Sequence, residues 1–324
     1  MTHPVIDAAS IGVHQVTMPI PFPLKEVHAY LIDAGGEWVM MDTGFPSEDA
    51  LAVLKPAVER ICGGPSKVHT AFISHYHPDH CGLAGWLEAA GTRIVVHERD
   101  WPSVERMNSD APVNPEEYSG SSFAAIAADS NFSFEQMRRE THGLRFALSK
   151  PHLVQGGETM TIGGRAFELI WTPGHTEGHL CVLDHATNTI FTGDHILARI
   201  TPHIGMWRDD GDSPLHRYEE SLALIEQMAP ARALPAHEAP IEDVPERARE
   251  LRRHHEERRQ HVLGVMSAQT RPALDIAKDL FRGREGGMQT YLALSETLAH
   301  LEALAIEGLV ISEEGAGTGM YRLA

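Results

Sequence analysis

A dense run of metal-binding residue types spans His75–His80, in the order H-x-H-x-D-H. The apolar and β-branched run Val68–Ser74 predicts a buried strand before it, and Gly82–Leu87 predicts the opening of a helix after it. The run therefore lies on a strand-to-helix loop, where side chains can converge. Because imidazole and carboxylate groups bind zinc, the chemistry that this run predicts is metal binding, with a solvated polar loop as the alternative.

The spacing within this run divides its side chains between two points. In extended backbone, His75 and His77 point to the same side, because alternate residues share a face. Asp79 and His80 follow Pro78, which bends the chain and can aim them at a second point nearby. Two histidines at one point and an Asp-His pair at another predict a site for two metal ions.

Other predicted strands also end in loops that hold a His or an Asp. Asp42 closes the run Trp38–Asp42, and His175, Asp194 and His237 follow the runs Arg165–Trp171, Thr189–Thr192 and Arg232–Leu234. Open α/β folds place their chemistry at such strand ends. The candidate metal ligands are His75, His77, Asp79, His80, His175, Asp194 and His237.

The elements around these loops alternate between strand and helix patterns. The predicted strands include Gly12–Met18, Ala29–Asp33, Arg93–His97, Glu158–Ile162 and Leu180–Asp184, and the predicted helices Glu48–Cys62 and Pro214–Met228. The alternation predicts an α/β fold for residues 1–245. His28 is expected to be structural and to precede its strand, and Cys81 to be a small buried residue.

Two segments outside this alternation are candidates for substrate contact. Residues 100–150 carry turn residues and then a predicted helix, Phe132–Leu148, so the segment is expected to form a lid or pocket wall. Its Arg138 and Arg139 either bind an acidic substrate group or form a solvated face. In the later loop 196–207, Met206 and Trp207 either line the pocket or pack in a core.

Residues 246–324 differ in character from the rest of the chain. A highly charged helix at 246–260 leads into helix patterns at Pro272–Phe281 and Met288–Glu307, and the end of the chain reads as a hairpin. Helices followed by a β wing predict a small winged-helix domain. Because residues 286–321 contain no Lys or Arg, we expect this domain not to bind nucleic acid and to pack on its own catalytic domain or a second subunit, which allows a homodimer.

Composition limits the classes of function. The net charge of −18 disfavours a general binder of nucleic acid or of anionic membranes. Three cysteines without a C-x-x-C motif do not form a disulfide framework, and no run is long and apolar enough to span a bilayer. The N-terminus has neither the basic nor the apolar region of a signal peptide, so a soluble, cytoplasmic protein is expected.

The order of these motifs resembles the metallo-β-lactamase-fold hydrolases. H-x-H-x-D-H, then a His in a P-G-H-T-x-G-H loop, then a strand end in Gly-Asp and a last His follow that family over roughly residues 10–245. The resemblance implies an αββα sandwich with metals at one edge. The tail is similar to the winged-helix domain found in one branch of that superfamily.

The resemblance also implies a role for each candidate ligand. One zinc ion would be held by His75, His77 and His175, and a second by Asp79, His80 and His237, with Asp194 bridging both. Asp42 would orient a ligand, and Thr176 and His179 fit similar supporting roles. His195 can touch the site or not, whereas His97, His203, His254 and His255 are expected to be ordinary polar or surface residues.

The function implied is a binuclear zinc hydrolase whose metal-bridging hydroxide attacks a small ester, thioester or lactone, with Asp79 and Asp42 assisting catalysis. Three observations narrow the superfamily: Asp194 disfavours the lactamases, the 43-residue spacing from Asp194 to His237 disfavours an inserted RNA-cleaving domain, and His77 disfavours the flavodiiron proteins. A metal-dependent nuclease or phosphodiesterase and a mononuclear iron sulfur dioxygenase remain as alternatives, with Fe or Mn as alternative metals.

Overall fold

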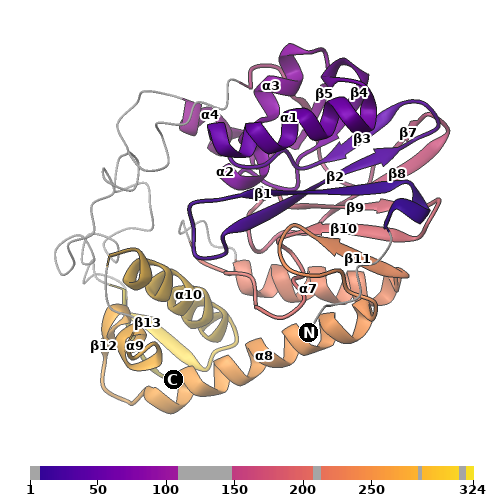
Figure 1. The fold of residues 1–324 in the computed structure, drawn as a ribbon. Helices are drawn as coiled ribbons and strands as arrows, with labels where there is room; N and C mark the ends of the chain where they lie inside the picture. Colours follow the sequence, from indigo (N-terminus) through magenta and orange to yellow (C-terminus); the bar gives the residue numbers. More distant parts are fainter. Residues whose placement is uncertain (1–7, 109–147, 207–212, 284–286, 314–318) are drawn as a thin grey trace. The chain divides into compact units, whose positions relative to one another are not determined.

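The structure is a computed structural model that describes residues 8–108, 148–206, 213–283, 287–313 and 319–324 (Figure 1). The chain divides into two compact units. The described residues of the first unit lie within Met1–Asp110, Leu144–Pro202 and Ala223–Ala248, and those of the second within His203–Leu222 and Arg249–Ala324. The domain boundary between residues 245 and 246 stays a prediction.

Two β-sheets form the centre of the first unit. The six-stranded sheet has the order β1-β2-β3-β4-β5-β6 and consists of β1 (Val13–Pro19), β2 (Glu26–Asp33), β3 (Trp38–Met41), β4 (Val68–Phe72), β5 (Arg93–His97) and β6 (His152–Val154). The five-stranded sheet has the order β11-β10-β9-β8-β7 and consists of β7 (Thr159–Ile162), β8 (Arg165–Trp171), β9 (Leu180–Asp184), β10 (Thr189–Gly193) and β11 (Arg232–Pro235).

The first sheet is buried on both faces, because alternate residues of its strands enter two different cores. Tyr30 and Ile32 of β2 join one hydrophobic cluster with residues of the second sheet such as Phe167. Their neighbours Ala29 and Leu31 join another cluster with residues of the helices. This alternation has the period of two that a pleated strand imposes. The two sheets therefore pack face to face, and helices cover the outer face of the six-stranded sheet.

The first unit also contains helices, most of them between strands in the sequence. They are η1 (Ala8–Ile11), α1 (Glu48–Cys62), η2 (Pro65–Lys67), α2 (Pro78–Cys81), α3 (Ala84–Ala89) and α4 (Trp101–Asn108). The Ser47 side chain caps α1 by accepting the N–H of Ala50, and Gly63 ends it in the left-handed conformation at φ 82°. Leu54 and Val58 of α1 are fully buried, so the helix covers the sheet through its apolar face.

The strand directions bring the candidate loops to one edge of each sheet. β3, β4 and β5 pair in parallel, so Asp42, the His75–His80 loop and the loop after His97 leave the first sheet at the same edge. β8 and β10 are both antiparallel to β9, and β11 is parallel to β10. The chain therefore leaves the second sheet toward His175, Asp194 and His237 at a common edge as well.

The α/β class and the two-sheet sandwich predicted from the sequence are confirmed. Two details are wrong. His28 lies within β2, because β2 begins at Glu26 to pair with β1 along its whole length. β6 was not predicted, because its three residues show no alternation and two of them are exposed. The predicted helix Phe132–Leu148 lies outside the described residues except for Leu148, which is not helical.

The second unit contains helices and a small sheet. α7 (Pro214–Met228) and α8 (Val244–Val265) each begin or end in the first unit, and α9 (Ala273–Leu280) and α10 (Gly287–Ile306) lie in the second. β12 (Arg271–Pro272), β13 (Val310–Glu313) and β14 (Met320–Leu323) form a sheet in the order β12-β14-β13. The expected terminal hairpin is present as β13 and β14; its classification as a winged helix stays a prediction. Of the helices that the structure describes, none has the length and apolar character to cross a membrane.

Candidate metal centre

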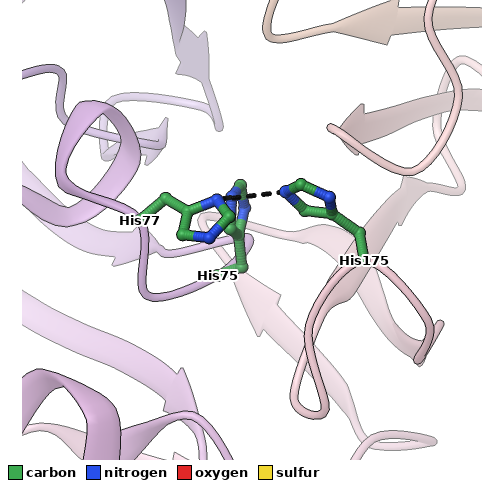
Figure 2. Close-up of side chains that lie close together, drawn as sticks. All are labelled: His75, His77 and His175. Carbon is green, nitrogen blue, oxygen red and sulfur yellow. Dashed lines mark hydrogen bonds between the residues drawn. The ribbon is translucent and has the colours of Figure 1, made fainter. Parts of the chain in front are cut away.

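Three imidazole nitrogens converge at the first group of candidate ligands, His75, His77 and His175 (Figure 2). His77 Nδ1 lies 2.8 Å from His75 Nε2 and 3.1 Å from His175 Nε2. His75 and His77 come from the loop after β4, and His175 from the loop after β8. Three nitrogen donors at such distances can together bind one cation such as zinc.

The environment keeps two histidines of the first group, His75 and His77, uncharged. Burial lowers the pKa of His75 well below its ordinary value, and neighbouring histidines, His80 foremost, lower it further. Burial and then His175 lower the pKa of His77 to about 3. Because the neutral imidazole is the form that binds a metal, these two side chains have the protonation state of ligands at neutral pH.

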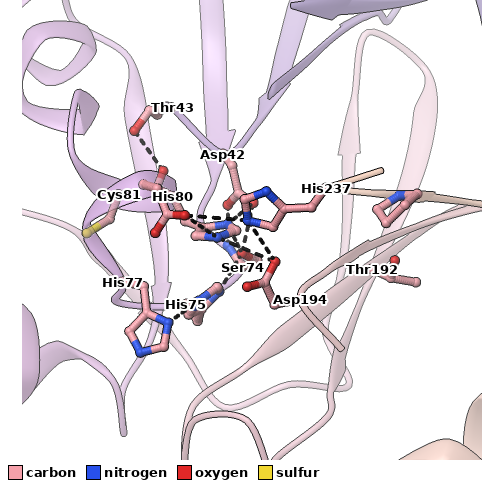
Figure 3. Close-up of polar contacts among 12 residues, drawn as sticks. Asp42, Thr43, Ser74, His75, His77, His80, Cys81, Thr192, Asp194 and His237 are labelled. Atoms are coloured by element: carbon pink, nitrogen blue, oxygen red, sulfur yellow. Dashed lines mark hydrogen bonds and ion pairs between the residues drawn. The ribbon is translucent and has the colours of Figure 1, made fainter. Parts of the chain in front are cut away.

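A second group joins Asp79, His80 and His237. Figure 3 shows two of its members, His80 and His237, beside Asp194. Asp79 Oδ2 lies 3.7 Å from His80 Nε2 and 3.4 Å from His237 Nε2. Both of these nitrogens are buried without a hydrogen-bond partner. Buried polar atoms without a partner are costly, and a cation at their meeting point would satisfy them.

Asp194 lies between the two groups and directs one oxygen to each. Its Oδ1 is 3.5 Å from His80 Nε2 and 3.4 Å from His237 Nε2, and its Oδ2 is 3.7 Å from His175 Nε2. The same carboxylate also completes a candidate ligand set with His75 and His80. This is the arrangement of a carboxylate that can bridge two cations.

The second group is more polar than the first. Burial by itself would lower the pKa of His80, but Asp194, Asp79 and Asp42 outweigh it and hold that pKa well above the ordinary value. Burial likewise opposes ionisation of Asp194, yet His237 and His80 hold its pKa well below the ordinary value. A cation would compete with the proton of His80 for the same nitrogen, so metal binding here releases a proton.

Asp42 and Ser74 orient one ligand of each group. Asp42 Oδ2 accepts from Ser74 Oγ at 2.8 Å and from His80 Nδ1 at 2.9 Å, and Oδ1 accepts from the Ser74 N–H at 2.7 Å. Since the Ser74 hydroxyl donates to Asp42, it accepts from His75 Nδ1, 2.9 Å away. Both rings are thereby held with Nε2 directed at other candidate ligands, at His77 for His75 and at Asp79 for His80. Asp42 itself has φ 55°, a strained value for a residue other than glycine.

His179 and His237 are held in a similar way. His237 Nδ1 donates to the Glu26 carbonyl at 2.7 Å, which leaves its Nε2 facing the carboxylates. His179 Nδ1 lies 2.9 Å from Thr172 Oγ1, and its Nε2 accepts the Asp194 N–H at 3.3 Å. Gly193 permits this contact, because a Cβ there would lie 2.6 Å from Ser74 Cβ and 2.9 Å from His179 Nε2. His179 therefore supports the loop that carries Asp194.

Two supporting residues escaped the sequence analysis. Ser74 was assigned only to the strand, and Asp100 was not singled out. Asp100 is buried and accepts hydrogen bonds from both loops of the first group. Burial raises its pKa to about 7, although hydrogen bonds from Thr176, Gly178 and Tyr76 oppose that rise. Its position just after β5, like that of Asp42 after β3, is the signal in the sequence that points to it.

The remaining histidines lie outside the two groups. His28 is structural as expected, since its ring nitrogens lie 3.0 Å from Thr17 Oγ1 and from the Glu238 carbonyl. His195 is buried, with its ring centre 5.8 Å from that of His179, and belongs to neither ligand set. His97 and His255, expected to be ordinary polar or surface residues, are both buried at 2% exposed and belong to none of the candidate ligand sets.

The candidate substrate contacts remain predictions. Met206 is buried in the hydrophobic core of the second unit, which favours core packing over a place in a pocket wall. Trp207, Arg138 and Arg139 lie outside the described residues. Cys81 is fully buried, as expected, and Thr176 lies beside His175 with its hydroxyl bonded to Asp100.

Two family models cover most of the chain. The model of the metallo-beta-lactamase superfamily matches residues 23–237, and that of the metallo-beta-lactamase-like C-terminal domain matches residues 260–324. The structure is similar to the metallo-beta-lactamase family protein TTHA1429 from Thermus thermophilus, with a TM-score of 0.82 and 28% identity, over 97% of this chain and 99% of that one.

Curated relatives agree with this match. The probable metallo-hydrolase YqjP of Bacillus subtilis is 21% identical over 308 residues, which cover 92% of this chain and 93% of YqjP. The lactamase-like protein nscB of Aspergillus fumigatus is 31% identical over 138 residues, which cover 42% of this chain and only 38% of nscB. With two stacked sheets and two His/Asp groups at their edge, this chain belongs to the metallo-beta-lactamase superfamily of metal-dependent hydrolases.

Proposed function

We propose that this chain is a binuclear zinc hydrolase that cleaves an ester, thioester or lactone bond of a small molecule. The observation that carries the proposal is that the two carboxylate oxygens of Asp194 face different ligand groups. Its Oδ1 faces His80 and His237, and its Oδ2 faces His175. A carboxylate held in this way would be able to bind two cations, one through each oxygen.

The donor atoms favour zinc over the harder divalent ions. The first group offers three imidazole nitrogens, and the second two nitrogens with carboxylate oxygens. Magnesium and calcium prefer oxygen ligands, whereas imidazole suits zinc and iron. His75 and His77 of the first group are neutral, which adds no charge repulsion against a divalent ion.

Two zinc ions held there would supply a hydroxide nucleophile at neutral pH and polarise the oxygen of the bond to be cleaved. The chain's own contribution is orientation and proton handling. Asp42 and Ser74 hold the rings of His80 and His75, and the Glu26 carbonyl holds His237. Asp79 is kept ionised because His80 and His237 offset the effect of burial on its pKa. It is therefore able to accept the proton of an attacking water.

Spacing and charge support a small substrate over a nucleic acid. The 43-residue spacing from Asp194 to His237 leaves little room for an inserted nucleic-acid-binding domain, and the net charge of −18 repels a polyanion. A small neutral or weakly charged acyl substrate fits better. A cytoplasmic location and a homodimer stay part of the proposal.

The test combines metal analysis with a hydrolysis screen. The full chain is purified without added metal, its zinc, iron and manganese are counted, and it is assayed on thioesters, lactones, simple esters and phosphodiesters. Two zinc ions per chain with turnover of one acyl class support the proposal. Preferential turnover of phosphodiesters or RNA would overturn it in favour of a nuclease, and a single iron with oxygen consumption would overturn it in favour of a dioxygenase.

A further inference from the structure

Asp100 joins two loops that are far apart in the sequence and that together carry all three ligands of the first group. Its Oδ2 accepts the Tyr76 N–H at 3.0 Å and the Thr176 hydroxyl at 2.8 Å. Its Oδ1 accepts the Gly178 N–H at 2.7 Å. Tyr76 stands between His75 and His77, and Thr176 directly follows His175, so each bond fixes backbone next to a candidate ligand.

The surroundings of Asp100 leave little freedom for this arrangement to relax. The residue is 1% exposed, and the Asp100 N–H is itself bonded to the His97 carbonyl at the end of β5. Gly178 allows the close approach, because a Cβ at that position would lie 2.6 Å from Asp100 N and 2.8 Å from its Cγ. A buried carboxylate that accepts three hydrogen bonds resists displacement, since each donor would otherwise be left without a partner.

We propose that Asp100 is a positioning residue that sets the separation of His175 from His75 and His77, and thereby the metal affinity of the three-histidine group alone. The inference rests on the proposed metal centre. The second group depends on different supports, because His80 is held by Asp42 and His237 by the Glu26 carbonyl. Loss of Asp100 is therefore expected to affect one metal and spare the other.

The variant that tests this is Asp100→Asn. Asparagine keeps the shape but replaces one acceptor oxygen by an NH₂ group, which must face either Gly178 N–H or the two donors Tyr76 and Thr176. Thr176→Val removes only the hydrogen bond from the Thr176 hydroxyl to Asp100, and Thr176→Ser keeps it. The matched control is Asp184→Asn. Asp184 is a second buried carboxylate that accepts from several donors, including Arg165 and the Ala186 N–H. It is the last residue of β9, whereas His179 precedes the first residue of that strand.

The measurement is zinc binding to each metal-free variant by competition with a chromophoric chelator, beside the thermal midpoint. For Asp100→Asn we expect one of the two binding events to weaken by about 10–100-fold and the other to stay within about twofold of the wild type. Thr176→Val should weaken the same event by a smaller factor and Thr176→Ser should not. Asp184→Asn should lower the thermal midpoint and leave both events unchanged.

Two results would overturn the inference: wild-type binding of both metals by Asp100→Asn, or equal weakening of both binding events in that variant. Weakening of the same single event in Asp184→Asn would also count against it. These outcomes are distinct from a failure of the proposed function, which would appear in the wild type as fewer than two zinc ions.

Discussion

Among the described residues, buried histidines cluster in both units, and the two clusters differ in what faces them. In the first unit the imidazoles converge with Asp79 and Asp194 into ligand sets. In the second unit His255 and His300 are 2% and 1% exposed, with ring centres 5.6 Å apart. Neither nitrogen of His255 has a hydrogen-bond partner. Arg259 and Arg258 are among the neighbours that lower the pKa of His255.

The difference shows that burial of histidine does not by itself make a metal site. Among the described residues, all three candidate ligand sets lie in the first unit. There, carboxylates and backbone carbonyls fix the tautomers and leave nitrogens pointing at one place. In the second unit the two rings are packed as core side chains beside arginines, which repel a cation. The carboxylates therefore distinguish the histidines of the candidate metal centre from the buried histidines of the second unit. The following predictions test this distinction.

The largest effect is expected from Asp194→Ala. Without the carboxylate between the groups, at least one metal should be lost together with nearly all hydrolysis, while the fold is largely kept. Metal counting and steady-state rates on the purified variant check this, with circular dichroism as the control for folding. Retention of both metals at full rate would mean that Asp194 does not link the groups.

The next effect separates the two ligand groups of the metal centre from one another. His75→Ala should damage the three-histidine group, whereas Asp79→Ala should weaken only the group that contains His80 and His237. Each variant is expected to keep about one metal, at a different site. Cobalt substitution followed by absorption spectroscopy distinguishes the two sites, and an identical spectrum from both variants would contradict the division.

A smaller effect is expected from Asp42→Ala. Asp42 supports His80 directly and His75 through Ser74, so its loss should reduce metal affinity or rate by about 10–100-fold without abolishing the centre. Titration of the metal-free variant with zinc gives the affinity. Wild-type affinity and rate in this variant would show that the ring orientations are set elsewhere.

A separate effect, on stability in acid rather than on metal binding, is expected in the second unit. Burial, with neighbouring histidines and arginines, lowers the pKa of His255 to about 2, and burial lowers that of His300 to about 4. Since the ordinary value is 6.5, the unfolded chain takes up protons below pH 6.5 that the folded chain does not. Each histidine should therefore reduce the free energy of unfolding by roughly 1.4 kcal/mol per pH unit between 6.5 and its folded pKa.

Hydrogen exchange of α8 and α10 between pH 7.5 and 5.5 measures this loss, after correction for the intrinsic exchange rate. His255→Leu should make the protection of these helices less dependent on pH. The control is His261→Gln, because His261 is exposed on the same helix. Equal pH dependence in the wild type and His255→Leu would show that the buried ring does not govern acid stability.

Prediction from sequence succeeded where the signal is local. The ranges predicted for α1, β5, β8, β9 and α7 agree with the structure, because apolar spacing and flanking turn residues mark them. The seven candidate ligands come together because strand ends in an α/β fold share an edge. Asp100 was missed because its role depends on bonds to residues 24, 76 and 78 positions away. The burial of His255 depends on tertiary contacts with Tyr218 and His300, which no local pattern reports.

X-ray absorption at the zinc edge tests the central claim most directly, because it reports the metal ions and their separation without a substrate. For wild-type protein loaded with two zinc ions, we expect nitrogen and oxygen neighbours dominated by imidazole and a metal–metal scattering shell at roughly 3.5–4 Å. Asp194→Ala should lose that shell. A wild-type spectrum with imidazole neighbours but no metal–metal shell, at two zinc ions per chain, would contradict a centre bridged by Asp194.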